Sequence, residues 1–361
     1  MPHRAVTALE ETLRAHVGLG KSRLETLCQI TVGMISARTV NLSHIASEWS
    51  GTAQTASAYR RAQRFFQHVQ LPPDWSAPLV IRLLGLKGSW RLALDRTQWK
   101  IGTKDVNILM LAVITPRFRV PLMWSLIDGA GCSDSDARIA LIQRYLDIFG
   151  ADSIELLLAD REFVGLRWLR YLNDNNVPFA VRLKETLIVT PEDGRPRTLR
   201  SLLRNCRKKR VFRADLSDDP ECPLALNFAA KRIKGGELLI VVSNTPARAA
   251  LDAYKSRWAI ECLFGDAKTR GLNLEDTRLT DPRKLDLLLG LVALAIAWAG
   301  RTAALLLGCR APKRKAHGYF AKSRFRIGFD HIRRLLRTDP AAAVIPWRTI
   351  PRNPLKPRRV V

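Results

Sequence analysis

Hydrophobic and polar positions along the chain divide it into regions of different periodicity. Through residues 1–85, apolar side chains recur three and four positions apart, which predicts helices. A polar stretch, 50–57, interrupts this pattern, and a short basic helix is expected from Tyr59 until Leu71-Pro72-Pro73 ends it. We therefore expect residues 1–85 to form a helical N-terminal domain.

Residues 90–184 show a different pattern, in which short apolar runs alternate with turns and helical segments. The run 154–159 is apolar except at Glu155, which predicts a central strand buried on both faces. Ser133 or Ser135 is expected to cap the helix that precedes this strand. The expected elements are strands 90–99, 106–114 and 120–127, helix 133–149, strand 154–159, helix 166–172 and strand 177–183. This order is that of a ribonuclease-H-like α/β domain.

The following residues interrupt that domain and then complete it. Short strand candidates at 187–190, 209–213, 224–230 and 237–242 predict a β-rich insertion over 185–250. Residues 251–308 are helical again and include the apolar run 287–300, which is too short to span a bilayer and indicates a buried core helix. The fold class expected is α/β, with a core formed by residues 86–184 and 251–308. A basic C-terminal region, 309–361, follows, helical around 325–336 and loosely ordered at its end.

Charge narrows the classes of partner. The formal net charge is +26 and the sequence pI is about 10.7, so a polyanion is the expected partner. Nucleic acid is favoured over a membrane surface and over a basic scaffold of the ribosomal kind. Arg60, Arg61 and Arg64 on the short basic helix suit phosphate contacts, so residues 1–85 are expected to form a DNA-binding domain, although a solvated helix face explains these arginines equally well.

Cysteine usage and the N-terminus exclude other classes. The six cysteines form no C-x-x-C pair and have no histidine at ligand spacing, which argues against a zinc site and a disulfide scaffold. Residues 1–21 lack the apolar core of a signal peptide. We expect a cytoplasmic protein that does not enter a membrane.

Two aspartates lie where the expected sheet would place chemistry. Asp95 lies within the first apolar strand, where burial is costly unless the carboxylate is paired or bound to metal. Asp160 follows the apolar run 154–159, at the carboxyl end of a central strand. Strands 1 and 4 are neighbours in the expected fold, so the two carboxylates would lie side by side and favour a divalent cation. Taken singly, each aspartate is weak evidence.

The segment after the insertion carries a stronger signal. At 100° per residue, an α-helix would place four polar residues within an arc of roughly 60°, with an apolar arc elsewhere. The four are a phenol, a guanidinium, a carboxylate and an ammonium: Tyr254, Arg257, Glu261 and Lys268. Glu261 could complete a carboxylate triad while the two cations hold phosphate oxygens. An exposed helix with an Arg257–Glu261 ion pair is the alternative, and the helix alone does not decide between them.

The spacing Tyr-x2-Arg-x3-Glu-x6-Lys resembles the signature of the IS4-family DDE transposases, the Tn5 and Tn10 type. Asp160-Arg161-Glu162-Phe163 resembles the motif around that family's second aspartate. The order of Asp95, Asp160, β-rich insertion and Glu261 is similar to the family's layout, as are the helical N-terminus and the basic C-terminus. The resemblance extends over most of the chain.

The resemblance implies a bacterial, nucleoid-associated enzyme that moves an insertion sequence by cut-and-paste transposition. Its metal ligands would be Asp95, Asp160 and Glu261, holding two Mg2+ or Mn2+ ions. Tyr254, Arg257, Lys268 and Arg161 would contact DNA. The partners implied are double-stranded DNA, as terminal inverted repeats and as target, and a second copy of the chain on the paired ends.

One departure from the family pattern concerns base flipping. Relatives stack a tryptophan of the β-rich insertion on a flipped base, but residues 185–250 contain none. The substitutes considered are Phe212, Phe228, Trp168 and Trp258. Two alternatives to a transposase stay open: a metal-dependent nuclease of the same fold without strand transfer, and a non-catalytic DNA-binding protein derived from a transposase.

Overall fold

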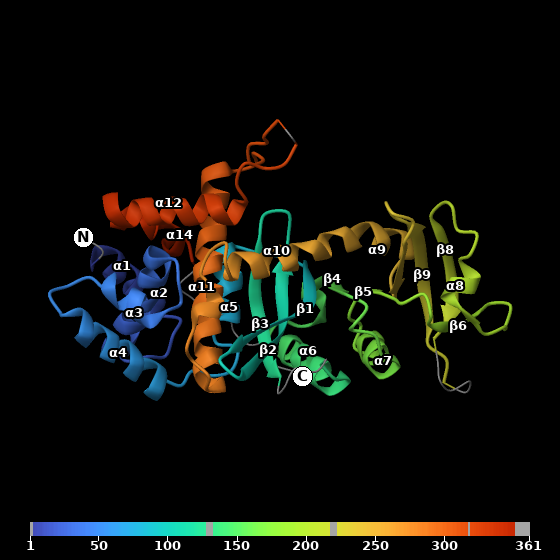
Figure 1. Ribbon diagram of the computed structural model, residues 1–361, viewed down its shortest axis with the longest axis horizontal. Coiled ribbons are helices and arrows are strands. Elements are labelled where there is room, and N and C mark those ends of the chain that lie inside the picture. Colours follow the sequence, from blue (N-terminus) through green and yellow to red (C-terminus); the bar gives the residue numbers. More distant parts are fainter. Residues whose placement is uncertain (1–2, 128–132, 217–221, 317, 351–361) are drawn as a thin grey trace.

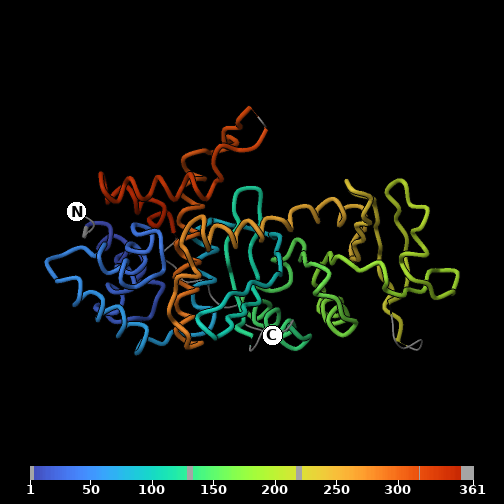
Figure 2. Tube along the Cα trace, viewed as in Figure 1, coloured from blue at the N-terminus to red at the C-terminus, as the bar shows by residue number. Residues whose placement is uncertain are grey.

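The structure is a computed structural model that describes residues 3–127, 133–216, 222–316 and 318–350. The molecule is elongated, with a helical region at one end, a central mixed sheet, and a β-rich extension at the other end (Figure 1). The Cα trace shows that the C-terminal helices return to the helical end, next to the N-terminal helices (Figure 2). The expected loose end of the tail lies at 351–361, outside the described residues.

Five helices form the N-terminal region, where the spacing of apolar side chains predicted helices. They are α1 (His3–Leu13), α2 (Lys21–Ala37), α3 (Leu42–Ser47), α4 (Thr55–His68) and α5 (Ala77–Leu84). Helix α4 is amphipathic, since its buried side chains recur at helical spacing: Ala58, Ala62, Phe65 and Phe66. Its opposite face is polar and exposed.

The first five strands form the central part of the sheet. They are β1 (Trp90–Ile101), β2 (Lys104–Ile114), β3 (Arg119–Ile127), β4 (Ile154–Ala159) and β5 (Phe179–Arg182), in the spatial order β3-β2-β1-β4-β5. Strand β1 pairs antiparallel with β2 and parallel with β4, so the first and fourth strands are neighbours as predicted. Strand β4 is buried except at Glu155, which confirms the interpretation of a central strand.

The predicted β-rich insertion continues the same sheet. Strand β10 (Leu238–Ser243) pairs with β5, and the ten-stranded order continues as β10-β9-β8-β6-β7. The remaining elements of this extension are β6 (Ile188–Pro191), β7 (Arg197–Thr198), α8 (Leu199–Leu202), β8 (Arg210–Asp215) and β9 (Ala225–Arg232). The chain therefore leaves the central sheet through β5 and returns through its neighbour β10.

Helices flank the sheet. In Figure 1, α6 (Ser135–Phe149) and α7 (Leu166–Asp174) lie below the strands, and α9 (Ala247–Ala253) and α10 (Trp258–Ala267) run above them. The cap of α6 differs from the expected serines: Asp134 accepts a hydrogen bond from the backbone N–H of Ala137 at 2.7 Å. The carboxylate of Asp134 thus satisfies an N–H that would otherwise be unpaired at the helix start.

Helix α11 (Pro282–Leu307) is the longest and contains the apolar run 287–300. It is apolar and long enough to cross a membrane by composition, yet 94% of its most apolar window is buried inside the molecule. It packs against α5, β3 and α12 (Arg324–Thr338), and the short helices α13 (Pro340–Ala343) and α14 (Ile345–Arg348) close its far side. The indole N–H of Trp298 donates to the backbone oxygen of Ala343 at 3.0 Å. The predicted core helix is confirmed.

Candidate active site

Neighbouring parallel strands bring the two predicted aspartates to one edge of the sheet. Leu94 of β1 is paired with Ala159 of β4, and Asp95 and Asp160 are the next residues of their chains. The Asp95 side chain is 16% exposed, and one of its oxygens accepts the backbone N–H of Arg96 at 2.8 Å. The parallel register is thus what places both carboxyl groups at the same level of the sheet.

Asp95 lies in surroundings that oppose its negative charge. Burial, together with repulsion from Glu162 and Asp160, raises the pKa of Asp95 to about 6. The backbone N–H of Arg96 and the guanidinium of Arg257 act against that rise. Three carboxylates therefore interact electrostatically at this edge, and a cation there would stabilise all of them.

The element that carries the predicted polar stripe is not one continuous α-helix. Tyr254–Arg257 form a 3-10 turn, α10 begins at Trp258, and Lys268 lies just beyond its last residue. The hydroxyl of Ser256 donates to the backbone oxygen of Ala253 at 2.6 Å, an interaction that competes with regular helical hydrogen bonding. The prediction of a single stripe within roughly 60° was wrong for this reason, although the apolar side of α10 is buried as expected.

Arg257 connects two of the predicted carboxylates. Its guanidinium contacts Asp95 at 3.1 Å and forms an ion pair with Glu261 one turn further along the chain. The Arg257 side chain is 12% exposed. Burial alone would lower the pKa of Arg257, but the surrounding acidic groups raise it, so this guanidinium stays charged.

Tyr254 joins the same cluster through the second aspartate. Its hydroxyl donates to Asp160 at 3.3 Å, and burial together with the charge of Asp160 raises the pKa of this phenol. Tyr254 is hydrogen-bonded to Asp160, and Arg257 is bonded to both Asp95 and Glu261. The charge of Asp160 also acts on Asp95 and Arg257, so these two groups form one polar cluster between β1, β4 and the start of α10. The structure brings together five of the residues that the sequence singled out.

Lys268 lies outside this cluster. Its ammonium pairs with Glu275 at 2.7 Å, donates to the backbone oxygen of Gln98 at 3.3 Å, and lies 5.4 Å from the centre of the Trp99 ring. These contacts connect the end of α10 to β1. The ammonium expected beside the carboxylates is thus engaged elsewhere in the free protein.

Two residues of the site were not assigned a role from the sequence. Glu162 raises the pKa of Asp95 and lies 3.5 Å from the side chain of Arg96. Asp266, on the buried side of α10, pairs with Arg119 of β3 at 2.7 Å and is 3% exposed. This pair fixes α10 against the sheet. Glu162 could have been found from the motif that includes it, whereas the spacing of Asp266 carries no such signal.

The predicted basic DNA contacts differ in their environment. Arg60, Arg64 and Arg161 are exposed. Arg61 instead forms an ion pair with Glu25 at 3.0 Å and donates to the hydroxyl of Thr26 at 2.9 Å. Arg61 therefore joins α4 to α2, and its assignment as a DNA contact is not supported by its position.

The four aromatic residues considered for base stacking differ in their exposure to solvent. Trp168 and Phe228 are completely buried, and Phe212 stacks on Phe228 at 5.1 Å between ring centres. Trp258, the first residue of α10, is 62% exposed. Trp258 is the one of the four whose ring lies open to solvent beside the carboxylate cluster.

The donor atoms at the cluster suit a hard divalent cation, since they are carboxylate oxygens without a soft ligand. The acidic groups that repel one another at Asp95 also fit such an ion. Among the described residues, no three acidic, histidine or cysteine side chains are grouped closely enough in this arrangement to ligate a metal together. The guanidinium of Arg257 occupies the position between Asp95 and Glu261.

Comparisons with known proteins place this geometry in a family. Residues 86–298 match the transposase DDE domain. No curated protein matches the chain. Among solved structures it is similar to an endonuclease V from Bacillus subtilis at 11% identity and a TM-score of 0.27, over 62% of this chain and 89% of that chain. The family match covers more than half of the sequence and includes both aspartate strands and α10. The chain therefore belongs to the transposase DDE domain family, whose activity is phosphoryl transfer on nucleic acid.

Proposed function

We propose that this chain is a transposase of the IS4 family that cuts an insertion sequence out of DNA and joins it to a target. The observation that carries the proposal is the single polar cluster in which Asp95, Asp160, Glu261, Arg257 and Tyr254 meet. The strand order β3-β2-β1-β4-β5 around it is the order of a ribonuclease-H-like core, which supports the same assignment.

Asp95, Asp160 and Glu261 would hold two Mg2+ or Mn2+ ions. Bound there, these ions would supply Lewis-acid activation of a water or a DNA 3′-hydroxyl and stabilise the leaving oxygen. Arg257 would then exchange its carboxylate partners for a DNA phosphate, for which its planar guanidinium has the matching geometry. Tyr254 would donate a hydrogen bond near the same phosphate.

The substrate proposed is double-stranded DNA, first the inverted repeats at the ends of the element and then the target. Two copies of the chain would act together on the paired ends, in the cytoplasm of a bacterium. The net charge of +26 supports a polyanionic substrate. The exposed Trp258 is the proposed stacking residue if a base leaves the helix during cleavage.

The proposal is tested by cleavage and strand transfer with the full-length chain on plasmid DNA that carries the element ends. Asp160→Asn and Glu261→Gln should each lower the cleavage rate roughly a thousandfold or more, because they remove metal ligands. Binding of the ends, measured without metal, should change little. Asp174→Asn and Glu11→Gln remove exposed acids far from the cluster and serve as matched controls.

A variant with Glu261→Gln that cuts at the normal rate in Mg2+ would remove Glu261 from the site. A metal-dependent nuclease of the same family is the second candidate, and the joining assay separates the two. Cut ends that are never found joined to a second plasmid would favour the nuclease. Failure to cut in either Mg2+ or Mn2+ would favour a DNA-binding protein that has lost catalysis.

A further inference from the structure

Arg138 of α6 is a buried arginine that lies against the turn after the second aspartate. It is 5% exposed, although a guanidinium is costly to remove from water. Burial of an arginine is tolerated where its five N–H groups find acceptors. The acceptors that Arg138 uses therefore show which part of the chain it holds in place.

One side of the guanidinium is fixed at the start of its own helix. The Nε of Arg138 donates to the hydroxyl of Ser133 at 2.9 Å, and a terminal nitrogen donates to the backbone oxygen of the same residue. Ser133 is itself 3% exposed. The anchor of this arginine is therefore local and shielded from water.

The other hydrogen bonds of Arg138 reach the turn 160–164. Arg138 donates to the backbone oxygen of Glu162 at 3.1 Å and to that of Val164 at 3.4 Å. Between these two residues, Phe163 is completely buried, and the centre of its ring lies 5.2 Å from the guanidinium carbon. The turn is closed by the N–H of Phe163, which donates to the backbone oxygen of Asp160 at 2.9 Å. Arg138 thus contacts three consecutive residues of the turn.

The acidic side chains of the same turn belong to the carboxylate cluster. Glu162 lies 3.5 Å from Arg96 of β1, and both Asp160 and Glu162 repel the negative charge of Asp95. Arg138 binds this turn through its backbone oxygens, whereas the cluster is formed by its side chains. A single turn therefore connects the start of α6 to the site.

The turn depends on such outside support because no regular structure holds it. Residues 160–165 lie between the last residue of β4 and the first residue of α7, so their backbone oxygens need partners from elsewhere. A functional side chain must be held within about 0.5 Å of its productive position. If the bonds from Arg138 were lost, the turn would loosen and Asp160 would move with it.

We propose that Arg138 is a positioning residue for the second aspartate, since its guanidinium holds the turn 160–164 so that Asp160 and Glu162 face Asp95. Arg138 acts through the backbone of the turn and contacts neither DNA nor a metal ion in this role. The inference rests on the proposed function, because it takes Asp160 as a metal ligand. It adds a residue of α6, outside the motifs that identified the site, to those on which the site depends.

The test measures Mn2+ binding to the full-length chain by electron paramagnetic resonance, alone and with an element-end duplex. Arg138→Ala should weaken Mn2+ binding roughly tenfold to a hundredfold, as expected when a group that orients metal ligands is removed. Hydrogen exchange at the Phe163 amide should become faster, because its bond to Asp160 depends on the turn. Guanidinium added at a non-denaturing concentration should restore part of the Mn2+ affinity, whereas sodium chloride at the same concentration should not.

Arg138→Lys is the second variant, in case Arg138→Ala does not fold. It keeps the positive charge, but an ammonium is a compact point charge and cannot bridge Ser133 and the turn as a planar guanidinium does. Mn2+ binding should therefore weaken in the same direction as in Arg138→Ala, by a smaller factor.

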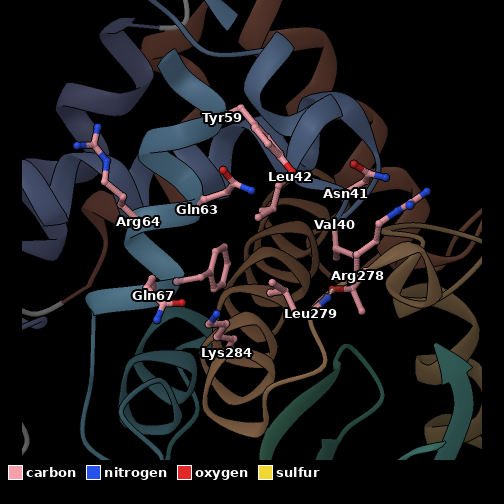
Figure 3. A pocket seen from close by; sticks show the side chains of 12 residues that line it. Val40, Asn41, Leu42, Tyr59, Gln63, Arg64, Gln67, Arg278, Leu279 and Lys284 are labelled. Carbon is pink, nitrogen blue, oxygen red and sulfur yellow. Dashed lines mark hydrogen bonds between the residues drawn. The ribbon is translucent and has the colours of Figure 1, made fainter. Parts of the chain in front are cut away.

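Arg144→Ala is the matched control for a purely structural role. Arg144 lies on the same helix and also bonds a backbone oxygen, that of Trp124 in β3, at 2.6 Å. Its loss should lower the melting temperature and leave Mn2+ binding and exchange at Phe163 unchanged. Lys284→Ala controls for net charge, because it removes a cation from the hollow of about 370 Å³ between α4 and the start of α11 (Figure 3).

The inference is overturned if the Arg138 variants that fold bind Mn2+ as tightly as the unmodified chain, or if Arg144→Ala loses as much affinity as they do. Cleavage and joining of element ends by the unmodified chain are measured separately. Weaker Mn2+ binding in Arg138→Ala, with no cleavage of DNA by the unmodified chain, would uphold the inference and reject the proposed function. Equal cleavage by the unmodified chain and by Arg138→Ala would do the reverse.

Discussion

At the scale of single residues, the carboxylate cluster is held with its charges only partly balanced. Asp95 is surrounded by Asp160 and Glu162, and Arg257 is the cation that contacts it. A group of acids that Arg257 and Arg96 neutralise only in part is costly to bury, so the site stores an electrostatic penalty that bound cations can relieve. Titration of Asp95 should reveal that penalty.

The first prediction concerns stability and pH in the absence of metal. The pKa of Asp95 is about 6 in the folded chain against 3.8 for an ordinary aspartate, so the folded state binds this proton more tightly than the unfolded state. The free energy of unfolding should therefore fall as the pH rises from about 4 to about 6. The free energy of unfolding of Asp95→Asn does not fall in this way. Above pH 6 the variant should therefore be stabilised relative to the unmodified chain by at most ~3 kcal/mol, compared with the difference near pH 4.

Chemical denaturation of both proteins at about pH 4 and about pH 7 measures this difference. Asp174→Asn, which changes an exposed acid on α7, is the control and should follow the unmodified chain at both values. If the difference between Asp95→Asn and the unmodified chain is the same at the two pH values, burial does not raise the pKa of Asp95.

The second prediction concerns Arg257 in the free protein. The guanidinium lowers the pKa of Asp95, so Arg257→Ala should move that pKa above about 6. It also removes the cation between Asp95 and Glu261, so Mn2+ should bind the DNA-free variant more tightly than the unmodified chain at neutral pH. Carboxyl NMR follows the titration, and calorimetry follows Mn2+.

Arg161→Ala provides the control for Arg257→Ala, because Arg161 is an exposed arginine directly after Asp160. It should leave the titration of Asp95 almost unchanged. Weaker Mn2+ binding in Arg257→Ala would contradict the view that the guanidinium and a metal ion compete for the same carboxylates.

The sequence indicated most members of the cluster but not how they are arranged. Spacing identified Tyr254, Arg257 and Glu261, and the apolar runs before them identified Asp95 and Asp160. The contact of Arg257 with Asp95 joins residues 162 positions apart, and local periodicity carries no information about such a pair. The position of Lys268 beside Glu275 and Trp99 could not be predicted from the sequence for the same reason.

At the scale of elements, the presence of a helix or strand was easier to predict than the residues at which it begins and ends. The run 154–159 and the helix around 287–300 are buried on all sides, and their patterns are correspondingly clear. The change from a 3-10 turn to α10 at Trp258 is a local one, next to the hydrogen bond from the Ser256 hydroxyl to the backbone oxygen of Ala253. Average residue periodicity cannot detect a change that small.

The third prediction concerns the packing of α11 against α12. A Cβ atom added at Gly328 of α12 would lie 1.8 Å from the backbone oxygen of Ala299, so the two helices touch through their backbones there. Gly328→Ala should force the helices apart and lower the free energy of unfolding by roughly 1–3 kcal/mol or more, despite the better helix propensity of alanine.

Thermal unfolding measures the effect of Gly328→Ala. Gly18→Ala is the matched control, because nothing lies within 4 Å of its added Cβ and that glycine is exposed. Equal melting temperatures for the two variants would show that α11 and α12 are not in backbone contact.

At the scale of the whole molecule, the excess of basic residues dominates. The chain carries 59 Lys and Arg against 33 Asp and Glu, and both α4 and the C-terminal helix α12 present basic groups. A surface of this kind binds DNA largely by releasing counterions from phosphates.

The fourth prediction follows from that charge. Affinity for any duplex should fall by roughly a thousandfold or more between about 50 mM and about 200 mM salt, as expected for six to ten phosphate contacts. Fluorescence anisotropy with a scrambled duplex measures it, and an uncharged nucleic acid analogue of the same sequence is the control. An affinity that is insensitive to salt would exclude a phosphate-tracking surface.

The division of the chain into regions was partly visible in the sequence. The helical N-terminal region and the β-rich character of 185–250 followed from periodicity. That the extension adds its strands to the central sheet did not, because β5 and β10 are both short and neither alternates clearly. Which strand edges pair depends on contacts between residues far apart in the sequence, and the sequence of a single strand does not determine it.

The pairing of β5 with β10 has a consequence for how this molecule can change over generations. The extension between Arg182 and Leu238 leaves the sheet at the end of β5 and re-enters it at the start of β10, and these two strands are neighbours. Lengthening, shortening or exchanging that extension leaves the position of the aspartate strands relative to α10 unchanged. The catalytic residues can therefore be inherited unchanged while the extension diversifies. Proteins of this architecture can acquire new DNA-binding elements in the extension without any change to the catalytic centre.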